Sequence, residues 1–266
     1  MIGDMSGKPS TEQQETVEAL LDASQRASRR VNIRQSFVQD GPQSRPVTGP
    51  IHRMLRAHDE RVLDLYLLHR ALVSSEPWST RPLDSRVWAR AIGVHDNDDG
   101  GIAMVSKIWR RLDETYRLVQ RHRDGRLAVL TALREDGSGE PYTSPNGKAR
   151  ADRYFTLPFE YWTADQRWYV TLSLPAKVML LIASSQAPDF VLPTEKANAW
   201  YGISTESAER GLRTLREVGL LSRRTTLKHA PLSPTGTTQE YHYTLTAPFG
   251  RLKKPKLTVI RDRSVS

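Results

Sequence analysis

The 266-residue chain contains no cysteine. Disulfide bonds and cysteine-ligated zinc or iron–sulfur centres are therefore excluded, and the composition suits a reducing compartment. Long apolar runs are missing too, because the best candidate, residues 178–183, falls far short of the roughly 20 residues that a membrane-spanning helix needs. The N-terminus MIGDMSGKPSTEQQ is polar and shows no secretory signal. We expect a cytoplasmic protein that does not enter the membrane.

Catalytic and ligand-binding motifs are also missing. The sequence has neither a GxxxxGK[ST] phosphate loop nor a GxSxG elbow, and its seven histidines form no HxH or HExxH spacing. The acidic stretch DNDDGG fails as a calcium loop, because counting from Asp96 puts Gly100 at position five and Lys107 at position twelve. We therefore expect no enzymatic activity, no cofactor and no metal site.

Acidic residues are outnumbered, which leaves a formal charge of +9 and a pI near 9.9. Such a balance favours polyanionic partners, either nucleic acid or an anionic membrane surface. Most of the cations are arginines, 30 against 9 lysines. Arginine makes bidentate contacts to phosphate and guanine; a genome rich in G and C would raise the arginine count as well.

The chain divides by composition into five segments. Residues 1–50 have too little apolar surface for a core, so we expect a flexible arm with one short helix, Thr11–Ala27. Residues 136–153 are rich in Gly, Pro, Ser and Asn and are expected to be a linker, and residues 249–266 a basic tail. The two remaining segments, 51–135 and 154–248, are the candidate domains.

Residues 51–135 show three helical patterns followed by two strand-like runs. The helices are expected at 58–75, 83–92 and 102–114, and the runs 116–120 and 127–133 flank RHRDGR. An Asp-Gly turn between two such runs is a strong hairpin signal. Three helices followed by a hairpin is the order typical of a winged helix.

Residues 154–248 repeat this order of elements with a different amino-acid sequence. After YFTLPFEYW, helices are expected at 174–184, with Ser173 as N-cap, and at 194–201, ending at Gly202. The third is GISTESAERGLRTLREVGLL, and its exit strand SRRTTLK should pair with residues 240–246. The predicted fold class is mainly α with small β-hairpins (α+β), built as tandem winged helix-turn-helix domains.

The helix over 205–218 has two distinct faces. Ala208, Leu212 and Leu215 form the inward stripe. In a helix-turn-helix the second helix enters the major groove by its N-terminal turns, where Arg, Glu, Ser and Thr can reach base edges. The predicted base contacts are Thr205, Glu206, Ser207, Arg210 and Arg213, and the predicted phosphate contacts of the following strand are Arg223, Arg224 and Lys228.

This stretch resembles the second half of a bacterial winged helix-turn-helix, with its G-[IV]-S turn, small and Leu core positions and G-L-L/I exit. The match is good over residues 190–225 and holds for the rest of 154–248 by element order only. The two unlike units resemble, in layout, plasmid-type replication initiators, although no long helix is evident between them. The resemblance implies DNA binding by the second helix and its wing.

The first unit offers a second set of phosphate contacts. Its third helix should bury Val105, Ile108, Trp109 and Leu112 and expose three cations, and its hairpin carries three more. The predicted contacts are Lys107, Arg110, Arg111, Arg121, Arg123 and Arg126. Asp96, Asp98 and Asp99 precede the helix and would repel phosphates, so this unit either touches DNA through its wing or mainly dimerises the protein.

We therefore expect a non-enzymatic, sequence-specific double-stranded DNA-binding protein associated with the nucleoid. A transcriptional regulator or mobile-element repressor is preferred, and a plasmid-type replication initiator that binds origin repeats is the alternative. A protein-binding adaptor and a structural-RNA binder are two further alternatives, the second disfavoured because no RNA-binding motif is present. A homodimer is left open.

Overall fold

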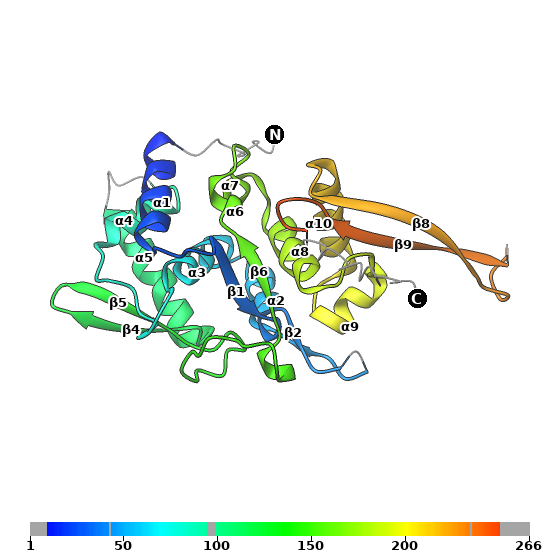
Figure 1. The fold of residues 1–266 in the computed structure, drawn as a ribbon, viewed down its shortest axis with the longest axis horizontal. Coiled ribbons are helices and arrows are strands. Elements are labelled where there is room, and N and C mark those ends of the chain that lie inside the picture. Colours follow the sequence, from blue (N-terminus) through cyan, green and yellow to red (C-terminus); the bar gives the residue numbers. More distant parts are fainter. Residues whose placement is uncertain (1–9, 43, 95–98, 235, 251–266) are drawn as a thin grey trace, which may run out of the picture.

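The computed structural model describes residues 10–42, 44–94, 99–234 and 236–250. The fold is mixed, with helices and four small antiparallel sheets (Figure 1). The N-terminal half contains these elements: α1 (Thr11–Ala23), β1 (Arg30–Arg34), η1 (Gln35–Phe37), β2 (Gln39–Asp40), β3 (Val47–Thr48), α2 (Pro50–Arg56), α3 (Glu60–Leu72), α4 (Ser85–Ala91), α5 (Asp99–Arg110), the π-helical turn η2 (Arg111–Thr115), β4 (Val119–Asp124) and β5 (Leu127–Ala132).

The C-terminal half follows after a long connection. Its elements are η3 (Arg150–Asp152), β6 (Tyr154–Pro158), α6 (Glu160–Thr163), α7 (Trp168–Thr171), α8 (Leu174–Ser185), β7 (Phe190–Val191), η4 (Thr194–Lys196), α9 (Ala197–Tyr201), α10 (Thr205–Glu217), β8 (Leu221–His229) and β9 (Thr237–Leu245). The helices and hairpins expected in both halves are confirmed, with their ends shifted by a few residues.

The two halves use strands in the same order. In the C-terminal half, β7 lies between α8 and α9 and pairs with β9, which pairs with β8. In the N-terminal half, the segment between α3 and α4 makes two isolated bridges to β5, Ser79 to Thr131 and Leu83 to Ala128, and β5 pairs with β4. Each half thus places a short extended segment between its first two helices and against the last strand of its hairpin.

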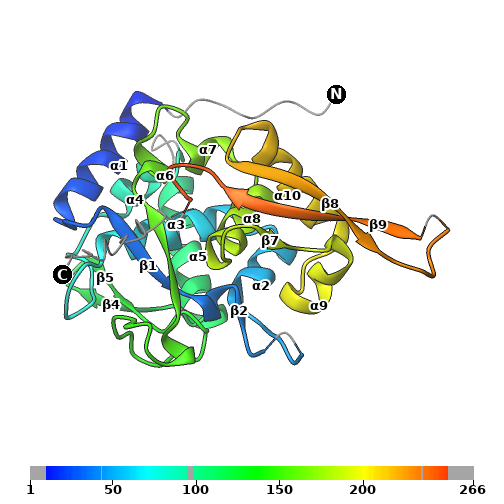
Figure 2. The same cartoon turned by 45° about the vertical axis from the view of Figure 1, so that its right-hand side comes forward.

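Helix α8 lies at the centre of the molecule, against α10 on one side and α2 and β6 on the other (Figures 1 and 2). Nearly all of its side chains are buried, as expected for a helix that is apolar all round. The exception in chemistry is Lys177, whose side chain is 2% exposed and whose Nζ lies 2.8 Å from carboxylate oxygens of Glu60 and Asp64 on α3. Burial raises the pKa of Asp64 to about 6 although Lys177 opposes the shift.

The expected separation into two domains needs correction. The buried apolar side chains form one continuous cluster that runs from Val17 in α1 to Phe249 after β9. The ion pairs of Lys177 with Glu60 and Asp64 also join α8 of the C-terminal half to α3 of the N-terminal half. The two halves therefore share a core instead of folding around separate ones.

Residues 10–50 are not the flexible arm that their composition predicts. Helix α1 buries Val17 and Leu21 against the rest of the core, with exposed fractions of 0% and 1%. Strand β1 pairs with β6, from Arg30 opposite Pro158 to Arg34 opposite Tyr154 (Figure 1). A thin apolar stripe suffices here because the partner surfaces come from elements far along the chain.

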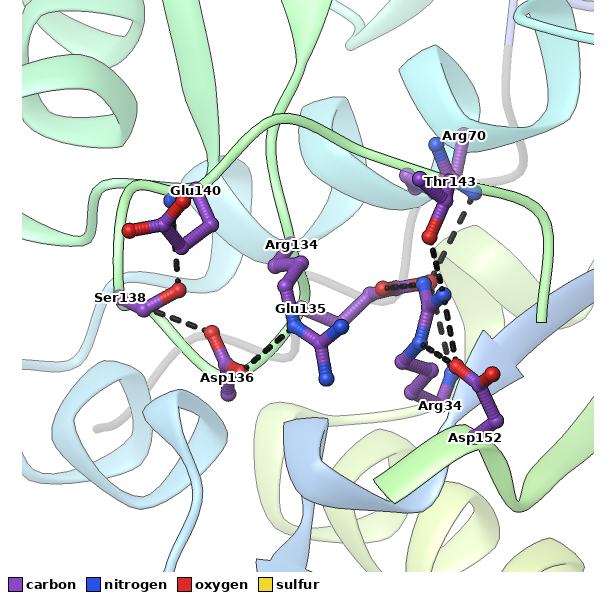
Figure 3. A network of polar contacts seen from close by, with 9 residues as sticks. All are labelled: Arg34, Arg70, Arg134, Glu135, Asp136, Ser138, Glu140, Thr143 and Asp152. Atoms are coloured by element: carbon purple, nitrogen blue, oxygen red, sulfur yellow. Dashed lines mark hydrogen bonds and ion pairs between the residues drawn. The ribbon is translucent and has the colours of Figure 1, made fainter. Parts of the chain in front are cut away.

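Residues 136–153 are likewise not a free linker, because they carry part of a buried ionic network (Figure 3). Arg34, fully buried, donates to Glu135 at 2.8 Å, to Asp152 at 3.0 Å and to Thr143 at 2.9 Å. Burial disfavours its charge, but the pair with Glu135 raises the pKa of Arg34 above its usual value.

A second buried arginine completes this network. Arg70 of α3 lies 3.7 Å from the other oxygen of Glu135, and its guanidinium stacks on the ring of Tyr142 with 3.8 Å to the centroid. Buried charges are tolerated only when paired and hydrogen-bonded. The network therefore fixes β1, α3 and the connection after β5 to one another.

Within the described part of the chain, no helix combines the length and the apolar character required to cross a membrane.

Candidate nucleic-acid interface

The turn between α9 and α10 has a C-cap for the first helix and an N-cap for the second. Gly202 ends α9 in the left-handed conformation, with φ of +68°, which glycine adopts at little cost. Ser204 then caps α10, and its hydroxyl accepts a hydrogen bond from the backbone N–H of Ser207 at 3.2 Å. The end of α9 at Gly202 and the turn that follows it, both expected from the sequence, are confirmed.

The inward face of α10 packs on α8. Ala208, Leu212 and Leu215 are buried as expected, and a fourth position, Gly211, joins them. A Cβ on Gly211 would lie 2.5 Å from the carbonyl oxygen of Pro175 and from Cγ of Met179. The two helices approach so closely that only glycine fits, which the sequence pattern did not reveal.

The outward face of α10 carries the predicted base contacts. Thr205, Glu206, Arg210 and Arg213 are exposed and Ser207 is half-buried. The hydroxyl of Ser207 is hydrogen-bonded to that of Ser204 at 2.9 Å. Neither Arg210 nor Arg213 forms an ion pair with a described residue. This face thus presents two uncommitted guanidinium groups.

The hairpin of β8 and β9 projects from the body beside α10 (Figures 1 and 2). Of the three predicted phosphate contacts on it, Arg223 stacks on Tyr241 with 4.4 Å from its guanidinium carbon to the ring centroid. Lys228 lies 3.4 Å from Glu240 across the hairpin. All three side chains are exposed, but each has a neighbour.

Arg224 has the most committed of these contacts. Its guanidinium donates to Asp189 at 2.7 Å, and that carboxylate also faces His242 at 3.4 Å. The hydrogen bond from Arg224 lowers the pKa of Asp189 below its usual value. Asp189 precedes β7 and was not singled out by sequence reasoning, because its proximity to the hairpin depends on the pairing of β7 with β9.

In the N-terminal half, α5 buries Val105, Ile108 and Trp109, with Leu112 following in η2, as expected. Lys107 and Arg110 are exposed. Arg111 pairs with Asp59, which also accepts a hydrogen bond from Tyr116, so its guanidinium is already engaged within the protein. The bond to Asp59 raises the pKa of Arg111.

The hairpin of β4 and β5 carries Arg121 and Arg123 on its first strand and Arg126 in the turn. Arg123 and Arg126 are exposed, and Arg121 is half-buried with its backbone N–H bonded to Asp113. The two hairpins lie at opposite ends of the molecule (Figure 1). The predicted contacts therefore form two separate surfaces.

No group of three or more potential metal-ligating side chains lies close enough to hold an ion within the described ranges. Asp96 and Asp98, which were expected to oppose phosphates near α5, fall outside those ranges, as does the tail beyond residue 250.

Sequence reasoning also missed Arg216. It is exposed on α10 and, like Arg223, lies near Tyr243. Burial raises the pKa of Tyr243, and the two arginines oppose this shift. The spacing of three residues between Arg216 and Arg213 was the available signal. Arg216 connects the cations of the helix with those of the hairpin.

Comparison with known proteins adds no relative: no family model, no curated protein and no solved structure matches the chain.

Proposed function

We propose that the chain is a sequence-specific double-stranded DNA-binding protein that acts as a transcriptional regulator or mobile-element repressor. The observation that carries the proposal is the outward face of α10, where Arg210 and Arg213 have no ionic partner among the described residues and follow a well-capped helix-turn-helix turn. Arginine on the second helix of such a motif can bind guanine O6 and N7 bidentately.

The arrangement of elements supports a winged helix-turn-helix in each half. Helices α8, α9 and α10 are followed by the β8–β9 hairpin, with β7 against β9. Helices α3, α4 and α5 are followed by the β4–β5 hairpin, with Ser79 and Leu83 bridged to β5. In this proposal α10 reads bases, and the two hairpins and α5 supply phosphate contacts.

Charge supports DNA over a protein partner. The formal charge is +9, and exposed arginines lie on both hairpins and on the outer face of α10. Phosphate contacts make affinity fall steeply with salt, and base contacts add sequence dependence. A protein-binding adaptor would show no duplex binding that depends on both the salt concentration and the DNA sequence.

The test uses the full chain and a duplex selected from random sequence by repeated binding. Arg210→Ala and Arg213→Ala should each weaken binding to the selected duplex by about 1–3 kcal/mol and relax its sequence preference. Lys148→Ala, which removes one exposed positive charge from the connection after β5, is the charge-matched control. Unchanged affinity and preference in both arginine variants would show that α10 does not read sequence.

A replication initiator is the second candidate, and one observation favours it. The two unlike halves share a core, so one chain would present two unequal DNA-binding surfaces at a fixed separation. Sequencing the DNA retained by the protein from its own genome distinguishes the candidates. A cluster of repeats at one locus would indicate an initiator, and dispersed promoter sites would indicate a regulator.

A further inference from the structure

A polar pocket of about 570 Å³ is lined by residues that belong neither to the two hairpins nor to α10. Three segments form it: residues 35–41 of η1 and β2, residues 147–154 around η3, and residues 185–187 at the end of α8. The first two of these segments lie side by side below the β1–β6 pair (Figure 1). Its volume is within the range of small-molecule sites.

Two polar groups in the pocket wall have no partner in the described part of the protein. The side chain of Ser36 is 6% exposed, and its Oγ makes no hydrogen bond. Nε2 of Gln39 is also buried without an acceptor. Buried polar groups are almost always satisfied, so an unsatisfied donor and hydroxyl in one wall favour a ligand with polar groups.

The charged groups of the pocket favour an anion. Arg150 and Arg153 are exposed in its lining, and neither forms an ion pair with a described residue. The one carboxylate in the lining, Asp40, accepts a hydrogen bond from the backbone N–H of Gly41. Two free guanidinium groups are suited to bidentate contacts with phosphate.

An aromatic ring completes the lining. Tyr154 is 37% exposed, and Gly147 lies beside its ring. Exposed tyrosine rings provide stacking surfaces for nucleobases. We propose that this pocket binds a nucleotide, with its phosphate on Arg150 and Arg153, its base on Tyr154, and its polar edge bonded to Ser36 and Gln39.

The nucleotide has two sources with the same chemistry, a free mononucleotide or the terminal nucleotide of a single strand. Isothermal titration calorimetry of the full chain with AMP, GMP, CMP and dTMP tests the first, and the 5′-phosphorylated dinucleotides of the same bases test the second. Tighter binding of a dinucleotide assigns the site to a strand end, and equal or weaker binding assigns it to a free nucleotide; both outcomes support the pocket.

Two variants connect binding to the pocket. Arg150→Ala/Arg153→Ala should weaken the nucleotide at least about tenfold, because charge-assisted hydrogen bonds are among the stronger polar contacts. Ser36→Ala should weaken it severalfold, and it removes no hydrogen bond within the described protein, so its melting temperature without ligand should stay unchanged.

Two results would overturn the proposal: no nucleotide saturates the protein at millimolar concentration, or the double variant binds as tightly as the parent. Inorganic phosphate binding as tightly as the best nucleotide would overturn the assignment of a base to Tyr154. Arg210→Ala/Arg213→Ala should leave nucleotide binding unchanged. The pocket and the duplex-binding face of α10 thus succeed or fail separately.

Discussion

Arg34 and Glu135 form a fully buried ion pair, with 2.8 Å between Nη1 and Oε2 and no exposed side-chain surface on either residue. They are separated by a hundred residues of sequence, and Arg70 approaches the same carboxylate from α3. The pair fixes β1 to the connection that follows β5. It explains why two segments with little apolar surface are nevertheless folded (Figure 3).

Glu135→Gln should destabilise the protein by about 3–5 kcal/mol, because it leaves the buried guanidinium groups of Arg34 and Arg70 without their shared carboxylate. Asp136→Asn is the matched control, since Asp136 pairs with Arg134 where a quarter of each side chain is exposed. Pairs of that kind contribute about 1 kcal/mol or less. Urea denaturation measures both, and equal losses would contradict the assigned burial.

Gly211→Ala should destabilise the protein by about 1–3 kcal/mol, because the new methyl group would clash with the carbonyl oxygen of Pro175 in α8. Gly100→Ala is the control. Gly100 lies exposed in the first turn of α5 with no atom within 4 Å of an added Cβ, so alanine there should be neutral or stabilising by up to about 1 kcal/mol. Thermal denaturation compares them, and similar melting temperatures would disprove the close helix crossing.

His69 should make the protein less stable in acid. It is fully buried and bonded through Nε2 to the carbonyl of Leu130, and burial lowers its pKa from 6.5 to about 3. Below pH 6.5 the unfolded chain binds a proton that the folded chain does not, so the free energy of unfolding falls by about 1.4 kcal/mol per pH unit.

The measurement is urea denaturation at pH 7 and pH 5 for the parent and for His69→Gln, in which the side-chain amide can still donate to Leu130. The parent should lose about 2 kcal/mol more than the variant over this interval. Parallel losses would show that another group dominates the acid response.

Asp189→Asn should strengthen non-specific duplex binding, because it releases the guanidinium of Arg224 for a phosphate. The slope of log affinity against log salt should steepen by about 0.9, the value for one additional phosphate contact. This prediction depends on the proposed DNA-binding function. It is measured by fluorescence anisotropy across a series of salt concentrations.

Glu15→Gln makes the same charge change at an exposed position of α1, a helix far from the β8–β9 hairpin (Figures 1 and 2). It should leave the slope unchanged. Adding Arg224→Ala to Asp189→Asn should return the slope to that of the parent. If the double variant keeps the steeper slope, Arg224 is not the released contact.

The sequence predicts α10 well because all the signals are local. The Gly202 turn, the Ser204 cap and the stripe of Ala208, Leu212 and Leu215 lie within fourteen residues of one another. Such periodicity determines which face a helix buries before its partner is known. The same reasoning located both hairpins.

What the sequence did not predict depends on distant partners. Strand β1 contains Arg30, Asn32 and Arg34 in alternation, and its partner β6 lies more than a hundred residues away. A fully buried arginine is rare, so the residue type alone predicts that Arg34 is exposed. Its burial depends on Glu135, which lies beside it only in the folded chain. Gly211 likewise shows its role only when α8 is placed against it.

The shared core has a consequence for any duplex that both hairpins touch. Lys177 of α8 is bonded to Glu60 and Asp64 of α3, and β1 is paired with β6. Under the proposed function, the two contact surfaces therefore cannot slide along DNA independently. Their two DNA targets must then keep a constant rotational position relative to each other around the double helix. Inserting about five base pairs, half a turn of B-DNA, would rotate one target to the opposite side of the double helix, beyond the reach of the second hairpin.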